Sequence, residues 1–251
     1  MKSSMKMKLR YTGTACFVLA CGLILTGCAS VSKKSPFFTA NIKNVKTIAV
    51  MPADIKVYQL TAGGVQELID EWSESSKQMT QEALRQYLGE RFGFTMKFID
   101  EGWLKENHKD LWNANRALYE AVSYSALAHA YPGPDTFKDK VEMFDYTLGE
   151  EIQDLAKACE ADALLFISGF DYEATAGRTA LLFWNIMVGA VTGVTVIPKN
   201  PSLMTIGMVN AKTGSLDWFK ISPADMEYSF RNKKHIEVLV EWLTRDFLKT
   251  K

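Results

Sequence analysis

The side chains that most often do chemistry in enzymes are scattered along this sequence. The three histidines, His108, His129 and His235, form neither an HxxxH pair nor the HExxH pattern of a zinc site. The sequence also lacks a G-x-S-x-G nucleophile elbow, a phosphate-binding P-loop and a dinucleotide-binding G-x-G-x-x-G pattern. We therefore expect no metal site, no cofactor and no catalytic residue, and so a protein that is not an enzyme.

Acidic side chains form two groups in the sequence, which raises the question of glycoside hydrolysis. The two groups are Glu67, Asp70, Glu71 and Glu74, and then Glu150, Glu151 and Asp154. Both fall on expected helices, where a solvated polar face is the usual explanation. The two carboxylates of a glycosidase converge only in the folded protein. A cell-wall glycan-binding protein or an envelope hydrolase is therefore the alternative function, and Trp103 is the tryptophan best placed to stack on a sugar.

Cys28 is the residue whose surroundings predict a definite chemical step. A basic segment without acidic residues precedes an apolar run, 15–25, that is too short to span a bilayer. The following Leu25-Thr26-Gly27-Cys28 resembles the lipobox of bacterial lipoprotein precursors. The resemblance implies that residues 1–27 are a signal peptide cleaved between Gly27 and Cys28. It also implies a diacylglycerol on the thiol and an acyl chain such as palmitate on the new amino group.

An anchor of this kind defines the compartment in which the protein works. Two or more acyl chains hold a protein stably on a membrane. Ala29 follows the cysteine where an aspartate could stand, which resembles the pattern of lipoproteins sorted to the outer membrane. We therefore expect an outer-membrane protein that is lipid-anchored on the periplasmic face. The alternatives are an ordinary secretory signal with an incidental Cys28 and an uncleaved N-terminal helix.

Charge and composition exclude some classes of protein. The sequence has 29 basic and 29 acidic residues, and the leader holds four of the basic residues and no acidic one. The mature chain thus carries 25 basic residues against 29 acidic ones, whereas nucleic-acid-binding proteins usually show a basic excess. Hydrophobic residues make up 47% of the sequence, as in globular proteins. Cys159 lies at helical spacing from Ile152 and Leu155, which indicates a buried structural thiol.

Apolar periodicity and turn residues predict an alternation of strands and helices. The expected elements are strands at 45–54 and 57–60, a helix at 65–92, a strand at 94–99, a helix from 111 to 131, a helix from 147 to 159, a central strand at 161–174, a hairpin at 202–220 and a last helix at 236–247. Thr147 and Glu150 have the spacing of a capping box, and Gly214 suits the hairpin turn. This order predicts an α/β fold, a mixed β-sheet with helices packed on it, plus a C-terminal hairpin and helix.

The expected domain organisation is simple. Residues 28–43 are polar and aperiodic, so we expect a lipidated tether, in which Phe37-Phe38 could dock on the domain. Residues 44–251 are expected to form a single periplasmic α/β domain with an apolar insertion at 179–198. That insertion is open to three interpretations: a buried core element, a surface patch for partners or lipid, or a membrane span. A span would place the hairpin across the membrane from the first strands, so we favour the core element.

Several segments in this order resemble a known group of proteins. They are "TIAVMP", "ADALLFISG" and "NAKTGSLDW", which follow the lipobox. Together they resemble the curli secretion channel family and related periplasmic lipoproteins whose core is similar to the TolB amino-terminal domain. The resemblance implies a non-catalytic assembly or export factor of the outer membrane, often oligomeric, with an envelope protein or further copies of itself as partner. A pore-forming subunit is a second alternative, although the sequence lacks the two long amphipathic hairpins of such a pore.

Overall fold

The structure is a computed structural model that describes residues 32–63, 65–88, 93–131, 136–175, 202–222 and 228–247. The signal peptide, its cleavage position between Gly27 and Cys28, and the apolar run 179–198 lie outside the described residues. What the sequence predicts for these segments therefore stays a prediction.

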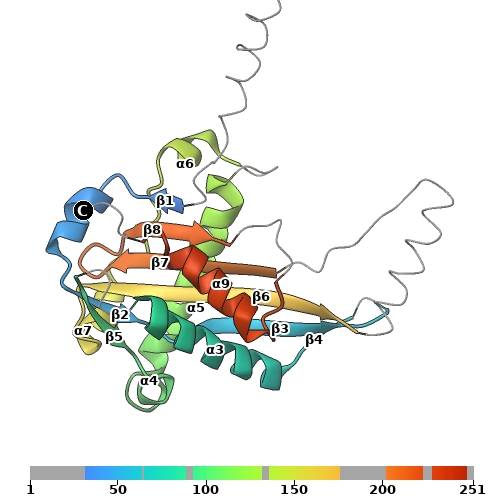
Figure 1. Ribbon diagram of the computed structural model, residues 1–251. Helices are drawn as coiled ribbons and strands as arrows, with labels where there is room; N and C mark the ends of the chain where they lie inside the picture. The colour runs from blue at the N-terminus through green and yellow to red at the C-terminus, as the bar shows by residue number, and fades with distance from the viewer. Residues whose placement is uncertain are drawn as a thin grey trace, which may run out of the picture. The chain divides into compact units, whose positions relative to one another are not determined.

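The described chain folds into a mixed β-sheet with helices packed on it, as the sequence predicts (Figure 1). The strands are β1 (Ser32–Lys34), β2 (Thr47–Val50), β3 (Asp54–Leu60), β4 (Gln66–Leu68), β5 (Thr95–Phe98), β6 (Ala163–Ala174), β7 (Ser202–Asn210) and β8 (Leu216–Ile221). The helices are α2 (Phe38–Asn41), η1 (Ile42–Asn44), α3 (Asp70–Leu88), α4 (Glu101–Asn107), α5 (Lys109–Ala130), α6 (Lys138–Glu142), α7 (Ile152–Ala158) and α9 (Lys233–Thr244).

Strand β6 is the centre of the sheet. Its first residues pair in parallel with β2, its later residues pair in parallel with β3, and β7 pairs antiparallel along its other side. Within the described residues the sheet is open, with the order β1-β8-β7-β6-β2-β5 and with β3 and β4 beside the second half of β6. Strand β6 therefore has a strand on each side. Where helices also cover both faces of the sheet, its sequence is continuously apolar.

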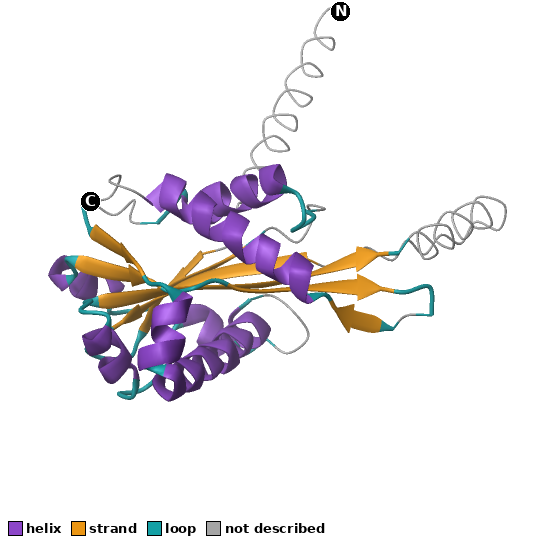
Figure 2. Cartoon of the chain, turned by 90° about the horizontal axis from the view of Figure 1, so that it is seen from below, coloured by secondary structure: helices purple, strands orange, loops and turns teal. Residues whose placement is uncertain are grey.

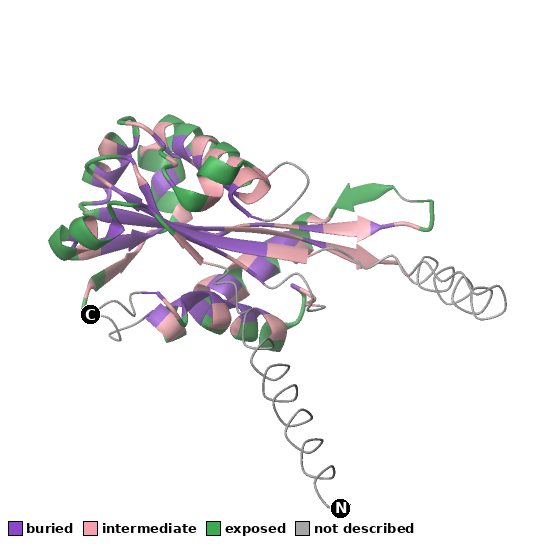
Figure 3. Ribbon diagram, turned by 90° about the horizontal axis from the view of Figure 1, so that it is seen from above, coloured by how far each residue is buried: buried purple, intermediate pink, exposed green. Residues whose placement is uncertain are grey.

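Two helical layers enclose the sheet (Figure 2). On one face, Leu165 and Ile206 pack with Leu84 of α3 and Leu239 of α9. The opposite face packs against a second set of helices, and its core consists chiefly of Leu164, Phe166, Phe219, Leu104 of α4, Trp112 and Tyr119 of α5, and Leu155 of α7. Burial is concentrated between these layers and decreases toward the tips of the long strands (Figure 3).

Most of the expected elements are present, and two helix predictions are wrong. The helix expected at 65–92 is β4 followed by α3, because Gln66–Leu68 pair with the end of β3 before the helix begins at Asp70. The capping box predicted at Thr147 and Glu150 is also not formed. Gly149 has φ 79° and turns the chain, and the Thr147 hydroxyl accepts a hydrogen bond from the Gly149 N–H, so the helix begins only at Ile152.

The first described residues correct the expected extent of the tether. Ser32–Lys34 pair antiparallel with β8, and α2 and η1 follow directly. Phe38 is buried, whereas Phe37 is 63% exposed. The tether predicted for residues 28–43 is therefore wrong from Ser32 onward. This segment is polar and shows no hydrophobic periodicity, so the sequence does not predict its structure. Backbone pairing with β8 and the buried ring of Phe38 hold it on the domain.

Asp217 ties this N-terminal segment to the sheet. Its side chain is fully buried and accepts hydrogen bonds from Ser35 Oγ at 2.8 Å and from Asn41 Nδ2 at 2.9 and 3.1 Å. The Ser35 N–H also donates to the Asp217 carbonyl oxygen at 2.9 Å. A buried carboxylate needs such donors, and the donors in turn lose their partner if it is removed.

We predict that Asp217→Ala lowers the free energy of unfolding by about 2–4 kcal/mol, because Ser35 and Asn41 are left with unpaired polar atoms. Urea denaturation followed by circular dichroism measures this. Asp154→Ala is the matched control, since Asp154 forms an exposed ion pair with Lys157 and should change stability by less than about 1 kcal/mol. Equal effects of the two substitutions would contradict the role given to Asp217.

Candidate functional site

The residues singled out from the sequence do not come together in one site. Both acidic groups are exposed, as a solvated surface predicts. The three histidines contact different aromatic rings: Trp103 lies beside His108, Phe137 beside His129 and Tyr228 beside His235. The described residues contain no group of three or more side chains that could hold a metal ion.

Cys159 is buried, as its helical spacing predicts. Burial raises the pKa of its thiol to about 11, and the nearby positive charge of Lys97 offsets this only in part. A thiol that stays protonated is a poor nucleophile, so Cys159 is a packing residue.

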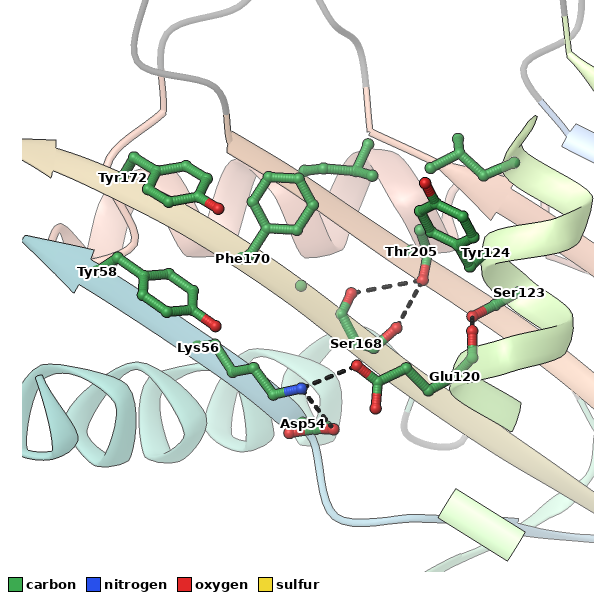
Figure 4. A pocket seen from close by; sticks show the side chains of 13 residues that line it. Asp54, Lys56, Tyr58, Glu120, Ser123, Tyr124, Ser168, Phe170, Tyr172 and Thr205 are labelled. Atoms are coloured by element: carbon green, nitrogen blue, oxygen red, sulfur yellow. Dashed lines mark hydrogen bonds and ion pairs between the residues drawn. The ribbon is translucent and has the colours of Figure 1, made fainter. Parts of the chain in front are cut away.

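A groove lined by aromatic side chains lies on the α5 face of the sheet (Figure 4). We call it the aromatic groove. It encloses about 190 Å³, and its aromatic side chains are Tyr58 from β3, Tyr124 from α5, and Phe170 and Tyr172 from β6. Sequence patterns do not predict this groove, because its residues come from three distant segments.

Alternation along β6 places these rings. Phe170 and Tyr172 point to the α5 face, together with the buried Leu164 and Phe166, but they are only half-buried. Tyr58 is the register partner of Tyr172, and the two rings stack with centroids 5.1 Å apart and planes at 22°. Phe170 meets Tyr172 edge-on at 5.6 Å. The three rings therefore form one continuous aromatic surface across two strands.

Charged side chains at one end of the groove neutralise one another. Lys56 Nζ lies 2.9 Å from Glu120 Oε1 and 4.0 Å from Asp54 Oδ2, and Arg116 lies 3.8 Å from Asp54. Burial opposes the charge of Lys56, but the hydrogen bond to Glu120 and the two carboxylate charges together raise the pKa of Lys56 above its ordinary value. Two cations and two anions thus leave this end of the groove without net charge.

Hydroxyl groups line the floor of the groove beside the rings. Ser168 Oγ and Thr205 Oγ1 are 2.9 Å apart and share a hydrogen bond, and Thr205 also donates to the Ser168 carbonyl oxygen at 3.4 Å. A hydroxyl has one donor and two acceptor positions, so this pair keeps capacity for a ligand.

The opposite face of the same part of β6 carries a carboxyl pair, in which Asp171 is buried and Glu173 is half-buried. Asp171 is 2% exposed and accepts a hydrogen bond from the Phe230 N–H at 2.8 Å, while Glu173 accepts one from the Ser229 hydroxyl. Burial raises the pKa of Asp171 to about 7, and the charge and hydrogen bond of Glu173 add to this. Gly169 leaves room for the Phe230 ring, since a Cβ there would lie 3.0 Å from it.

A second hollow, of about 650 Å³, lies at the other end of β6 and is lined mainly by polar residues. Two of its polar side chains already accept hydrogen bonds from backbone N–H groups. Asp162 Oδ2 accepts from the N–H groups of Lys46 and Thr47, and Asn210 Oδ1 accepts from those of Lys212 and Thr213. The aromatic groove is therefore the better candidate for a binding site.

Comparisons with known proteins show a weak structural similarity. No protein-family model and no curated protein sequence matches the chain. A PelC dodecamer from Paraburkholderia phytofirmans is similar with a TM-score of 0.34 and 8% identity, over 85% of this chain and 91% of that chain. The C-terminal domain of LpoB from Salmonella enterica is similar with a TM-score of 0.27 and 12% identity, over 74% of this chain and 90% of that chain.

The described residues contain no helix that is both long enough and apolar enough to cross a membrane.

We predict that the carboxyl pair makes stability depend on pH. The pKa of Asp171 is about 7 in the folded chain and lies near 4 in the unfolded chain, so the folded chain binds the extra proton between these values. The free energy of unfolding should therefore fall as pH rises from about 4 to 7, by about 2–4 kcal/mol from this group.

The measurement compares the wild type with Asp171→Asn by urea denaturation across that pH range. Asparagine can still accept from the Phe230 N–H but does not titrate, so the variant should gain stability relative to the wild type as pH rises. A stability difference that does not change between pH 4 and 7 would contradict the assignment.

Proposed function

We propose that the chain is a lipid-anchored, non-catalytic binding module at the periplasmic face of the bacterial outer membrane, where it holds other envelope components during assembly or export. The observation that carries the proposal is the aromatic groove. Half-buried aromatic rings beside mutually paired ions can bind a ligand with little rearrangement, whereas they supply no activated nucleophile. No histidine is present among the described residues that line it.

The charged residues of the groove also favour binding over hydrolysis. A glycosidase needs one protonated carboxyl group as an acid and a second carboxylate as a base or nucleophile. Here Lys56 lies between Asp54 and Glu120 and contacts both carboxylates. One ammonium group thus joins the two carboxylates in a paired cluster, whereas the acid and base of a glycosidase stand on either side of the substrate.

The predicted lipid anchor would keep the domain close to the membrane. Only three residues, 29–31, lie between Cys28 and Ser32, the first residue of β1, so four residue steps join the two. Because extended chain spans at most about 3.6 Å per residue, that distance is at most about 14 Å. A module anchored in this way is suited to holding an envelope protein, or further copies of itself, next to the bilayer.

Cell fractionation and crosslinking test this proposal. We expect the wild-type chain in the outer-membrane fraction, with an acylated Cys28 at its amino terminus by mass spectrometry and with crosslinks to an envelope protein or to itself. Cys28→Ala should leave the membrane fraction. Cys159→Ala is the matched control: it also removes one thiol, but one buried in the domain, and it should stay anchored.

An unmodified Cys28 in the mature chain, or equal membrane association of both variants, would contradict the lipid anchor. A chain that is anchored but forms no crosslink to any envelope component would contradict the binding role.

A further inference from the structure

We infer that the aromatic groove binds a neutral saccharide unit of an envelope glycan. The inference extends the proposed function, because it assigns a ligand class to the groove that the proposal leaves unassigned. It depends on the groove alone and not on the anchor at Cys28.

The size of the groove favours a ligand that places one ring in it. Its volume of about 190 Å³ lies below the roughly 300–1,000 Å³ of pockets for drug-sized molecules, so it has room for about one ring. A peptide strand could add only to a free sheet edge, but β6 pairs with β3 on one side and with β7 on the other. The floor of the groove therefore has no backbone groups to offer such a peptide.

The aromatic surface matches one side of a sugar ring. In a hexopyranose the C–H groups form an apolar face while the hydroxyl groups project around the ring. The face of an aromatic ring is electronegative and attracts such C–H groups. Tyr58 and Tyr172 stack on each other, which leaves one face of each ring outside the pair, and Phe170 extends the surface.

Polar side chains line the groove beside the rings and can bond to the hydroxyl groups of a sugar. Glu120 uses Oε1 for Lys56 and has a second carboxylate oxygen, and its side chain is 57% exposed. Ser168 and Thr205 bring hydroxyl groups to the floor, and Tyr124 brings one from α5 (Figure 4). These are donors and acceptors for hydroxyl groups rather than for a single fixed charge.

The paired charges select a neutral ligand. Lys56 and Arg116 each lie within 4.0 Å of Asp54 or Glu120, so an anionic group would meet a carboxylate beside each cation. An anionic polymer is therefore repelled by these two carboxylates, whereas a neutral sugar can bond to them without separating them from Lys56.

Titration with chitotetraose, a neutral β-1,4-linked N-acetylglucosamine oligomer, tests the inference on the full mature chain in detergent. Nuclear magnetic resonance should show shifts of the ring signals of Tyr58, Tyr124 and Tyr172, with a dissociation constant of order 1 mM. Tyr172→Ala should weaken binding by about 10-fold or more. Phe37→Ala is the matched control, because it removes another exposed aromatic ring, beside α2 and outside the groove, and it should leave binding unchanged.

Tyr124→Ala covers the case in which Tyr172→Ala does not fold, since Tyr124 is 73% exposed on α5. Three results would overturn the inference: no shift of groove signals up to about 10 mM sugar, equal binding by the Tyr124, Tyr172 and Phe37 variants, or tighter binding of an anionic oligosaccharide or a proline-rich peptide. Any of these leaves the acylation and crosslinking results intact. Cleavage of the tetraose would support the sugar site but contradict the non-catalytic role.

Discussion

Strand β6 extends beyond the helices that cover its α5 face. The second half of the strand is therefore only partly covered, and this is where the aromatic groove lies. Leu164 and Phe166 point to that face and are buried under α5, whereas Phe170 and Tyr172 continue the same alternation and are only half-buried. A sheet face that is covered by helices usually carries aliphatic and aromatic side chains. In β6 such side chains continue beyond the part of the strand that α5 covers. The result is a groove whose rings are held by the sheet yet open to a ligand.

The two faces of this part of β6 are stabilised by different means. On the α5 face, the charges of Asp54, Lys56 and Glu120 are paired at the rim of the groove. On the other face, Asp171 and Glu173 bind the segment that precedes α9, and the buried Phe230 packs against Gly169. The carboxyl pair therefore fixes the strand from behind, which keeps the aromatic side chains in front of it in defined positions. Rigid elements of this kind lose little conformational entropy when a ligand binds.

The sequence predicts the sheet well because its signals are local. The apolar run at 161–174 coincides with β6, and Gly214, at φ 69°, makes the turn of the β7–β8 hairpin. Non-local interactions account for the failures: β1 forms only because β8 offers an edge, and Asp217 holds residues that have no pattern of their own. The groove was missed for the same reason, although the alternation Phe170-Asp171-Tyr172-Glu173 is a local sign that one face of β6 is aromatic and the other acidic.

A binding role for the groove requires that the aromatic rings on the second half of β6 are accessible to solvent. Relaxation of tyrosine ring signals by a soluble gadolinium chelate measures this directly in the full mature chain. Tyr58, Tyr124 and Tyr172 should relax strongly, while Tyr119 and Tyr131, which are 2% and 9% exposed, serve as buried standards and should relax weakly. If Tyr58 and Tyr172 were as protected as Tyr119, another part of the chain would cover the groove, and the groove could not be a binding site.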